Sequence, residues 1–267
     1  MAKTSTWRLL TLCAGLCLLL MALTSYTPPQ PALAFATAQA TVDAATLHYN
    51  IHNYAGIPQS TTVDGNPVLG KPSAKVTMIV FLDFSCPHCA DYAPVVLQVV
   101  DKYVRSGQIK LIVHFETFVG GEFSENAAQA ALCAGKQRHY WQMQDALFNI
   151  QQASGIEAFT PEALQQVAAD LGLNGKTFAA CITSHRTMTT IQKSIQYGTT
   201  LGLTGVPSVL FSTDNKQFHF LKRSSGAEFI PTYADIENAL RIFKRTGKFP
   251  TIVDPTPTDQ ASLTQIF

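Results

Sequence analysis

The order of apolar and polar positions predicts where the first strands and the first helix lie. Val76–Phe84 is almost continuously apolar with several β-branched residues, which favours a strand buried on both faces. Apolar residues then recur at helical spacing from Cys89 to Val104, and Pro94 within that stripe predicts a kink, not a break. Ile109–Phe115 alternates between apolar and polar residues, as a second strand does. A strand, a helix and a strand without a hairpin turn predict a βαβ unit with parallel strands.

A block of helical spacing follows, from residue 124 to about residue 200. Ser124 is placed to cap one helix that runs through an alanine-rich segment as far as Phe148. The segment 160–162 (Thr-Pro-Glu) combines a cap residue, a proline and an acid, which is a helix-start signal. We therefore expect further helices at about 160–172, from Asn174 past Cys181, and at about 187–201.

Strand patterns return after the helical block. Pro207–Phe211 and Phe218–Leu221 are short apolar runs separated by Asp214-Asn215, which predicts a hairpin, and Tyr233–Phe243 has the stripe of a last helix. The order βαβ, helical block, ββα predicts an α/β fold with a helical domain inserted between its halves. We expect the α/β domain at 61–123 and 202–247, the insertion at 124–201 and a loose tail at 248–267.

The first 36 residues resemble an export signal. Lys3 and Arg8 precede an apolar stretch, and small residues around Ala34 and Ala36 follow it, which is typical of a cleaved signal peptide. The apolar stretch is also nearly long enough for an uncleaved membrane anchor, so both alternatives stay open. Either one exports the rest of the chain to an oxidising, extracytoplasmic compartment such as a periplasm or cell envelope. Residues 37–60 are interpreted as a linker, and membrane contact is expected only through an anchor.

Composition limits the classes of function. The chain has 267 residues, 46% of them hydrophobic and 14% charged, which suits folded domains and not a disordered chain. The formal net charge of +1 offers no basic excess to neutralise phosphates, so nucleic-acid binding is not expected. No repeat of fixed period is visible, which argues against solenoids and propellers.

The strongest chemical motif is Cys86-Pro87-His88-Cys89, at the junction of the buried strand and the amphipathic helix. A helix N-terminus stabilises an anion, so a cysteine there loses its proton more easily. We expect Cys86 to be exposed and to exchange with substrate, and Cys89 to point to the core and resolve the mixed disulfide. His88 adds hydrogen-bond donation and partial positive charge, and Pro87 pre-sets the helical φ.

A zinc site and a purely structural disulfide are the two alternative interpretations of Cys86 and Cys89. A zinc site needs two more ligands at close spacing, and neither Cys133 and Cys181 nor a pair of histidines supplies them, so no metal is expected. A purely structural disulfide is disfavoured because structural bridges usually close longer loops than Cys86 and Cys89 would. A reversible Cys86–Cys89 disulfide, with no cofactor, is the favoured interpretation.

A second motif, Gly205-Val206-Pro207, stands at the start of a predicted strand about 120 residues later. Alone it indicates only a loop leading into a strand, where proline is sterically allowed. Together with the dithiol it fits a cis proline packed opposite the cysteines, with the Val206 backbone free to pair with an extended substrate.

These residues resemble the DsbA-like thioredoxin-fold disulfide oxidoreductases. The likeness runs over roughly Val63 to Phe243 and rests on Phe84-Ser85-Cys86-Pro87-His88-Cys89, the helical insertion and Gly205-Val206-Pro207. The segment 81–87 (Phe-Leu-Asp-Phe-Ser-Cys-Pro) is similar to a branch common in bacterial envelopes. The resemblance implies a thioredoxin fold and a dithiol oxidase that acts on unfolded or reduced exported proteins. It further implies a quinone-linked membrane partner that reoxidises the enzyme.

By this resemblance Cys86 is the nucleophile, Cys89 the resolving thiol and Val206-Pro207 the cis-proline loop. One position departs from the family pattern: many members carry a buried acid six residues before the first cysteine, and here Val80 stands there. Asp83 is the nearest acid, and its position near a helix N-terminus favours a satisfied carboxylate at a strand end.

Several alternatives stay open at the level of sequence. Cys133 and Cys181 form either a structural disulfide or two small buried hydrophobic positions. The function is either oxidation of thiols, or reduction or isomerisation in the same fold, or a chaperone-like binding role that does not depend on the thiols. The redox direction depends on the energy difference between two states, and His88 favours the oxidant.

Overall fold

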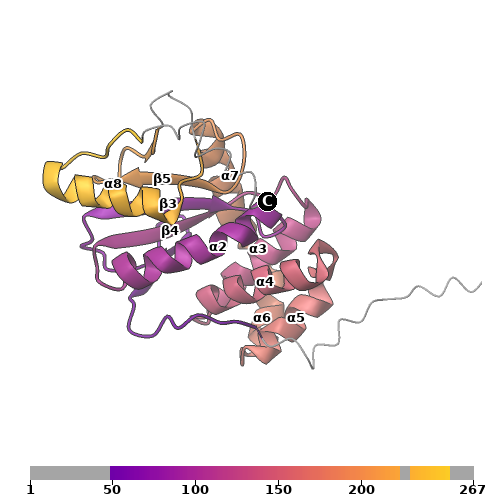
Figure 1. Ribbon diagram of the computed structural model, residues 1–267. Coiled ribbons are helices and arrows are strands. Elements are labelled where there is room, and N and C mark those ends of the chain that lie inside the picture. The colour runs from indigo at the N-terminus through magenta and orange to yellow at the C-terminus, as the bar shows by residue number, and fades with distance from the viewer. Residues whose placement is uncertain (1–48, 223–228, 253–267) are drawn as a thin grey trace, which may run out of the picture. The chain divides into compact units, whose positions relative to one another are not determined.

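The computed structural model describes residues 49–222 and 229–252. A six-stranded mixed sheet with strand order β1-β2-β4-β3-β5-β6 forms its centre (Figure 1). The central strands β3 (Val76–Leu82) and β4 (Ile109–Phe115) are parallel, and β5 (Ser208–Ser212) pairs with β3 in the antiparallel sense. The last strand, β6 (His219–Phe220), forms the predicted hairpin with β5.

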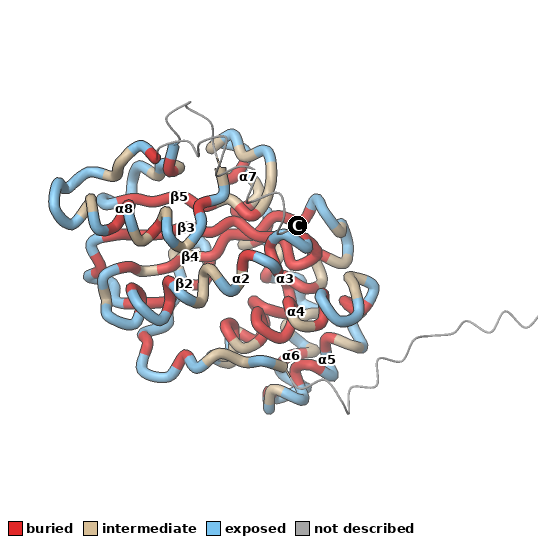
Figure 2. Tube along the Cα trace, in the orientation of Figure 1, coloured by how far each residue is buried: buried red, intermediate tan, exposed pale blue. Residues whose placement is uncertain are grey.

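The two faces of the sheet carry different helices. Helices α2 (Pro87–Val99) and α8 (Tyr233–Thr246) contact each other on one face, where Val80 and Leu82 point (Figure 1). Helix α7 (Met188–Thr200) covers the other face, where Ile79 and Phe81 point. All seven residues of β3 are buried, as predicted for a strand covered on both faces (Figure 2).

The helical block lies between β4 and β5 in the chain. It contains α3 (Glu122–Gly135), α4 (Tyr140–Ser154), a short 3-10 turn (Ile156–Ala158), α5 (Pro161–Asp170), α6 (Gly175–Thr183) and finally α7. Thr160 and Asn174 cap α5 and α6 through their side chains, as their sequence signals predict. The βαβ, helical block, ββα order confirms the predicted α/β fold with an inserted helical region.

The prediction of one helix from Ser124 to Phe148 is wrong. Helix α3 ends at Gly135, and α4 begins at Tyr140 and packs back against it. The turn between them holds Arg138 at a φ of 64°, a conformation that the sequence does not signal because Arg138 is not glycine. Ser124 is also not the cap, because α3 begins at Glu122 and Ser124 is buried inside its first turn.

Two regions expected to be loose are packed at their described ends. Tyr54 and Ile57, from the predicted linker, are buried in the core, and strands β1 (Gln59–Thr61) and β2 (Pro67–Leu69) extend the sheet beyond β4. At the other end Ile252 is buried and its backbone N–H donates to the carbonyl of Lys222. The remainder of the tail and the predicted signal or anchor at 1–36 lie outside the described residues.

The helix that follows the dithiol runs through Pro94 without a break and changes into a π-helical turn, Val100–Val104. No helix within residues 49–222 and 229–252 has the length and hydrophobicity needed to span a membrane.

Candidate active site

Cys86 occupies the N-cap position of α2, where strand β3 gives way to the helix. Its backbone is extended (φ −82°, ψ 117°), its N–H donates to the Asp83 carbonyl at 3.0 Å, and its own carbonyl accepts the first helical hydrogen bonds. Pro87 is the first helical residue, where the missing N–H has no intrahelical partner to lose. The local sequence therefore places the Cys86 sulfur beside the free N–H groups of a helix start.

The loop that precedes β5 brings the second motif against this sulfur. The peptide bond between Val206 and Pro207 is cis. The Sγ of Cys86 lies 3.6 Å from the carbonyl oxygen of Val206, to which it donates in its protonated form. Residues 120 positions apart in sequence thus form one site.

The expectation that Cys86 is exposed is wrong. Only 5% of Cys86 and 3% of Cys89 is exposed, whereas the two residues between them, Pro87 and His88, are exposed. Val206 packs on the same hydrophobic core and covers the sulfur of Cys86, a contact that no local pattern near the cysteines could show. The sulfur of Cys86 therefore lies against the Val206 carbonyl and is followed in sequence by two exposed residues, Pro87 and His88.

Both cysteines are free thiols, and their pKa values move in opposite directions. A hydrogen bond from the Cys89 thiol lowers the pKa of Cys86 to about 6, against desolvation, with further help from the backbone N–H groups of Cys89 and His88 and from the His88 side chain. Burial, followed by the hydrogen bond to Cys86, raises the pKa of Cys89 far above its ordinary value. At neutral pH the pair is therefore a Cys86 thiolate beside a protonated Cys89.

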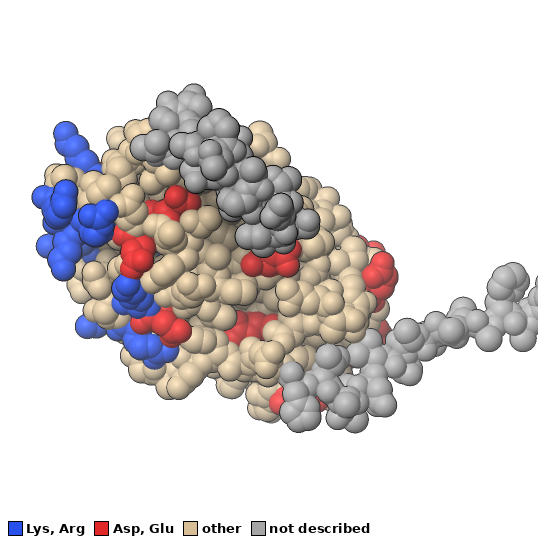
Figure 3. Space-filling model, viewed as in Figure 1, with Lys and Arg blue, Asp and Glu red and all other residues tan. Residues whose placement is uncertain are grey.

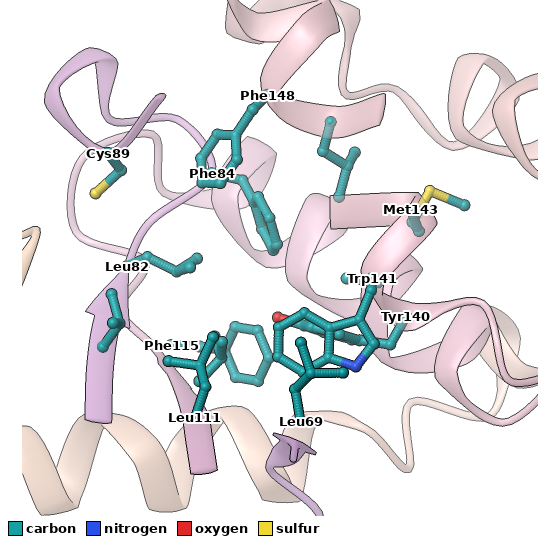
Figure 4. Packing of buried hydrophobic residues seen from close by; sticks show 14 of the residues in the cluster. Leu69, Leu82, Phe84, Cys89, Leu111, Phe115, Tyr140, Trp141, Met143 and Phe148 are labelled. Atoms are coloured by element: carbon teal, nitrogen blue, oxygen red, sulfur yellow. The ribbon is translucent and has the colours of Figure 1, made fainter. Parts of the chain in front are cut away.

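The floor of the site is apolar. Cys89 is buried and belongs to the same hydrophobic cluster as Leu82, Phe84 and Phe148 (Figure 4). A cavity of about 20 Å³ beneath Cys89 is lined by Val80 and Pro207 among others. Val80 therefore occupies the place beneath the second thiol where a family acid was expected.

Asp83 is a satisfied buried carboxylate, as its position suggested. It is 0% exposed and accepts hydrogen bonds from the backbone N–H groups of Ser85 and Val119, both at 2.9 Å, and from the Ser124 hydroxyl at 2.6 Å. Desolvation nevertheless raises the pKa of Asp83, against the three hydrogen bonds that lower it. The carboxylate thus ties the end of β3 to the start of α3.

Sequence reasoning missed the loop between β4 and α3. Gly120 is packed so closely on Ser85 that a Cβ at this position would collide with the Ser85 hydroxyl. The same loop exposes 62% of Phe118 and 41% of Val119. The sequence signal that could have identified this loop is an apolar pair followed by two glycines, Phe118-Val119-Gly120-Gly121. Because Gly120 packs on Ser85, the residue before Cys86, the loop that carries this exposed apolar pair adjoins the chain at the reactive cysteine.

The other cysteines are joined. Cys133 of α3 and Cys181 of α6 form a disulfide, with Cα atoms 5.7 Å apart and a sequence separation of 48. Within the described part of the chain no group of three or more His, Cys, Asp or Glu side chains is placed to hold a metal ion.

Comparisons with known proteins agree with this geometry. A family model described as "Thioredoxin" matches residues 62–225. The chain is 25% identical over 166 residues to the probable disulfide bond formation protein D of Bacillus anthracis, which covers 60% of this chain and 76% of that protein. The structure of BdbD from Bacillus subtilis (oxidised) is similar with a TM-score of 0.56 at 20% identity, over 69% of this chain and 94% of that one. DsbA of Chlamydia trachomatis gives a TM-score of 0.56 at 22% identity, over 70% of this chain and 98% of that one.

Proposed function

Because this chain belongs to the thioredoxin family, we propose that it forms disulfide bonds in exported proteins by exchange at Cys86 and Cys89. Its class as a thiol–disulfide oxidoreductase rests on its similarity to disulfide bond formation proteins. The observation that carries the proposal is the Cys86 sulfur, with its pKa lowered to about 6, held against the Val206 carbonyl of the cis-proline loop.

The reaction starts from the Cys86–Cys89 disulfide. A substrate thiolate attacks the sulfur of Cys86, the bond to Cys89 breaks, and Cys89 leaves and takes up a proton. The second substrate thiolate then attacks the substrate sulfur of the mixed disulfide and releases Cys86 as a thiolate. The substrate loses two electrons and two protons; the enzyme keeps both electrons and one proton on Cys89, and the other proton goes to solvent.

The two pKa values support oxidation in this direction. A thiol of low pKa leaves faster, so Cys86 is the better leaving group of the mixed disulfide. The hydrogen bonds to its thiolate stabilise the reduced enzyme, and that stabilisation makes the disulfide form a stronger oxidant. A membrane partner, quinone-linked in the family that this chain resembles, then accepts the electrons from the dithiol in an extracytoplasmic compartment.

The redox potential of the Cys86/Cys89 couple tests the proposal. Equilibration with glutathione should give a potential well above the roughly −270 mV of thioredoxin. Cys86→Ser should abolish oxidation of a reduced two-cysteine peptide, while Cys133→Ala with Cys181→Ala, a matched loss of the other pair, should retain it. A potential at the thioredoxin value would indicate a reductase, and full function of Cys86→Ser would indicate a binding role.

A further inference from the structure

A buried polar cluster joins the end of strand β3 to the loop 117–121, which connects β4 to α3. Its centre is Asp83, which is 0% exposed. One carboxylate oxygen accepts from the backbone N–H of Val119 at 2.9 Å. The other accepts from the backbone N–H of Ser85 at 2.9 Å and from the hydroxyl of Ser124 at 2.6 Å. Three donors favour the ionised carboxyl, and hydrogen bonds to an ionised acceptor are stronger than those between neutral groups.

Ser124 extends this cluster to the backbone of the loop. Its hydroxyl accepts from the backbone N–H of Gly120 at 3.0 Å and lies 2.8 Å from the hydroxyl of Ser85. A Cβ on Gly120 would come within 3.0 Å of side-chain atoms of both serines, so the loop backbone lies directly on them. The backbone N–H of Gly121 donates to the carbonyl of Thr117 at 3.0 Å and closes the loop on itself. These contacts fix the loop relative to the end of β3.

The backbone of Asp83 contacts both reactive cysteines. Its carbonyl accepts from the backbone N–H of Cys86 at 3.0 Å. Burial raises the pKa of Cys89, and a hydrogen bond from the backbone N–H of Asp83 to the Cys89 sulfur opposes that rise. Asp83 therefore holds the dithiol with its main chain and the loop 117–121 with its side chain. A change in its side-chain contacts would move the loop relative to Cys86.

The loop 117–121 presents an apolar surface beside the dithiol. Phe118 is 62% and Val119 is 41% exposed, and they are two of the four large hydrophobic residues that are exposed within residues 49–222 and 229–252. The loop includes no charged residue. Lysine and arginine gather instead over the end of α8, as Figure 3 shows. Exposed apolar residues that lie together mark interaction surfaces, so the loop favours an apolar partner.

We propose that Asp83 is a positioning residue for substrate binding. Together with Ser124 it holds the loop 117–121 beside Cys86, where the exposed apolar pair of the loop contacts apolar side chains next to the reacting cysteine of a substrate. This inference rests on the proposed function, since it concerns the substrate of the same exchange. Because Gly120 packs on the residue before Cys86, a substrate sulfur at Cys86 brings its flanking residues to this loop. Chains that have not folded expose apolar residues that folded proteins bury, so the loop favours unfolded substrates.

Oxidation of two reduced peptides tests the proposal, with leucine beside the two cysteines in one peptide and serine in the other. The wild-type protein should have the lower KM for the leucine peptide. Ser124→Ala removes the hydroxyl between Asp83 and Gly120 and should raise KM for the leucine peptide about fivefold, with kcat and the KM for the serine peptide nearly unchanged. Asp83→Asn should act in the same direction and more strongly, because an amide nitrogen cannot accept hydrogen bonds as a carboxylate oxygen does. Equal KM values for the two peptides in the wild type would overturn the proposal.

Ser194→Ala is the matched control, because it also removes a buried serine hydroxyl that makes a hydrogen bond. Ser194 of α7 is 0% exposed, and its hydroxyl donates to the Asn66 side chain at 2.7 Å. The control should lower stability in urea unfolding and leave KM unchanged. The pKa of Cys86 should stay at about 6 in both variants, since the groups that lower it include neither serine. Equal KM changes in Ser124→Ala and Ser194→Ala would assign the effect to lost stability and refute the positioning role.

A double-mutant cycle shows whether the effect passes through the apolar pair. In the Phe118→Ser background, Ser124→Ala should no longer raise KM for the leucine peptide, because the contact that it misplaces is already lost. Effects of the two changes that simply add would show that Ser124 acts elsewhere, against the proposal.

Peptide binding without exchange separates this inference from the proposed function. Calorimetry with Cys86→Ser and the same reduced peptides should show tighter binding of the leucine peptide, and adding Ser124→Ala should remove the difference. If the wild type oxidises neither peptide but this difference in binding remains, the proposed function fails and the positioning role stands. If the wild type oxidises both peptides and Ser124→Ala changes neither KM nor binding, the positioning role alone fails.

Discussion

The lowered pKa of Cys86 can be tested by removing, one at a time, the hydrogen bonds that cause it. With its pKa at about 6, roughly nine tenths of Cys86 is thiolate at pH 7, against about one per cent at the ordinary value of 9.0. The Cys89 thiol is the largest cause of this lowering, so Cys89→Ala should raise the pKa of Cys86 to roughly 7 or higher. Cys89→Ser keeps a hydroxyl donor in place and should raise it less.

His88 makes a smaller contribution through its backbone N–H and its side chain. His88→Ala removes only the side-chain part, so it should raise the pKa of Cys86 by less than Cys89→Ala does. His219→Ala, at an exposed histidine on β6, is the matched control and should leave the titration unchanged. The assay follows the ultraviolet absorbance of the thiolate against pH, with the rate of alkylation as a second readout.

Stability of the reduced protein should follow the same titration. The folded pKa of Cys86 lies below its unfolded value, so the thiolate stabilises the fold fully above the unfolded pKa and loses that effect as pH falls through about 6. The reduced protein should therefore lose stability relative to Cys86→Ser between about pH 9 and pH 5 in urea unfolding. A Cys86 pKa near 9, or a titration that neither Cys89→Ala nor His88→Ala alters, would refute this account of the site.

Three further changes test other parts of the structure. Cys133→Ala with Cys181→Ala opens a 48-residue loop and should cost up to about 4 kcal/mol in urea unfolding while the Cys86 titration stays the same. Phe118→Ser should raise KM for a reduced apolar peptide severalfold without moving the Cys86 pKa, and Val63→Ser, at a fully exposed valine, should not. Burial raises the pKa of Glu116 to about 7. Glu116 therefore stabilises the fold below about pH 4.5 and loses that effect as pH rises through 7. Glu116→Gln should flatten the dependence of the unfolding temperature on pH over this range.

The central part of the fold follows from local patterns. Strand β3, helix α2 and strand β4 each carry a hydrophobic period long enough to identify the element, and Thr160 and Asn174 mark helix starts by their chemistry. Strands β1 and β2 do not, because each is three residues long, and β2 joins the sheet only by pairing with β4, some forty residues away. The break between α3 and α4 had one local signal, Gly135, the last residue of α3, whereas the positive φ at Arg138 had none.

The candidate site also has one part that local sequence predicts and one part that depends on distant residues. A cysteine at a strand-to-helix junction with a proline after it predicts a reactive thiol from local sequence alone. Whether that thiol is exposed depends on what covers it, and the cover comes from Val206, which no spacing near Cys86 encodes. The same holds for Asp83, whose partners Val119 and Ser124 follow in the next loop and helix.

Val80 gives the second thiol an apolar neighbour in place of an acidic one. It lines a cavity of about 20 Å³ beneath Cys89, together with Gln144. A cavity of this volume has room for about one water molecule. No carboxylate lines that cavity within the described chain, and the nearest one, Asp83, is already engaged by three donors. Cys89 therefore keeps its proton while Cys86 is a thiolate. In the proposed cycle, release of substrate needs only the Cys86 thiolate as leaving group. Reoxidation begins with the same thiolate, but closing the Cys86–Cys89 disulfide requires Cys89 to lose its proton, and no carboxylate lines the cavity to accept it.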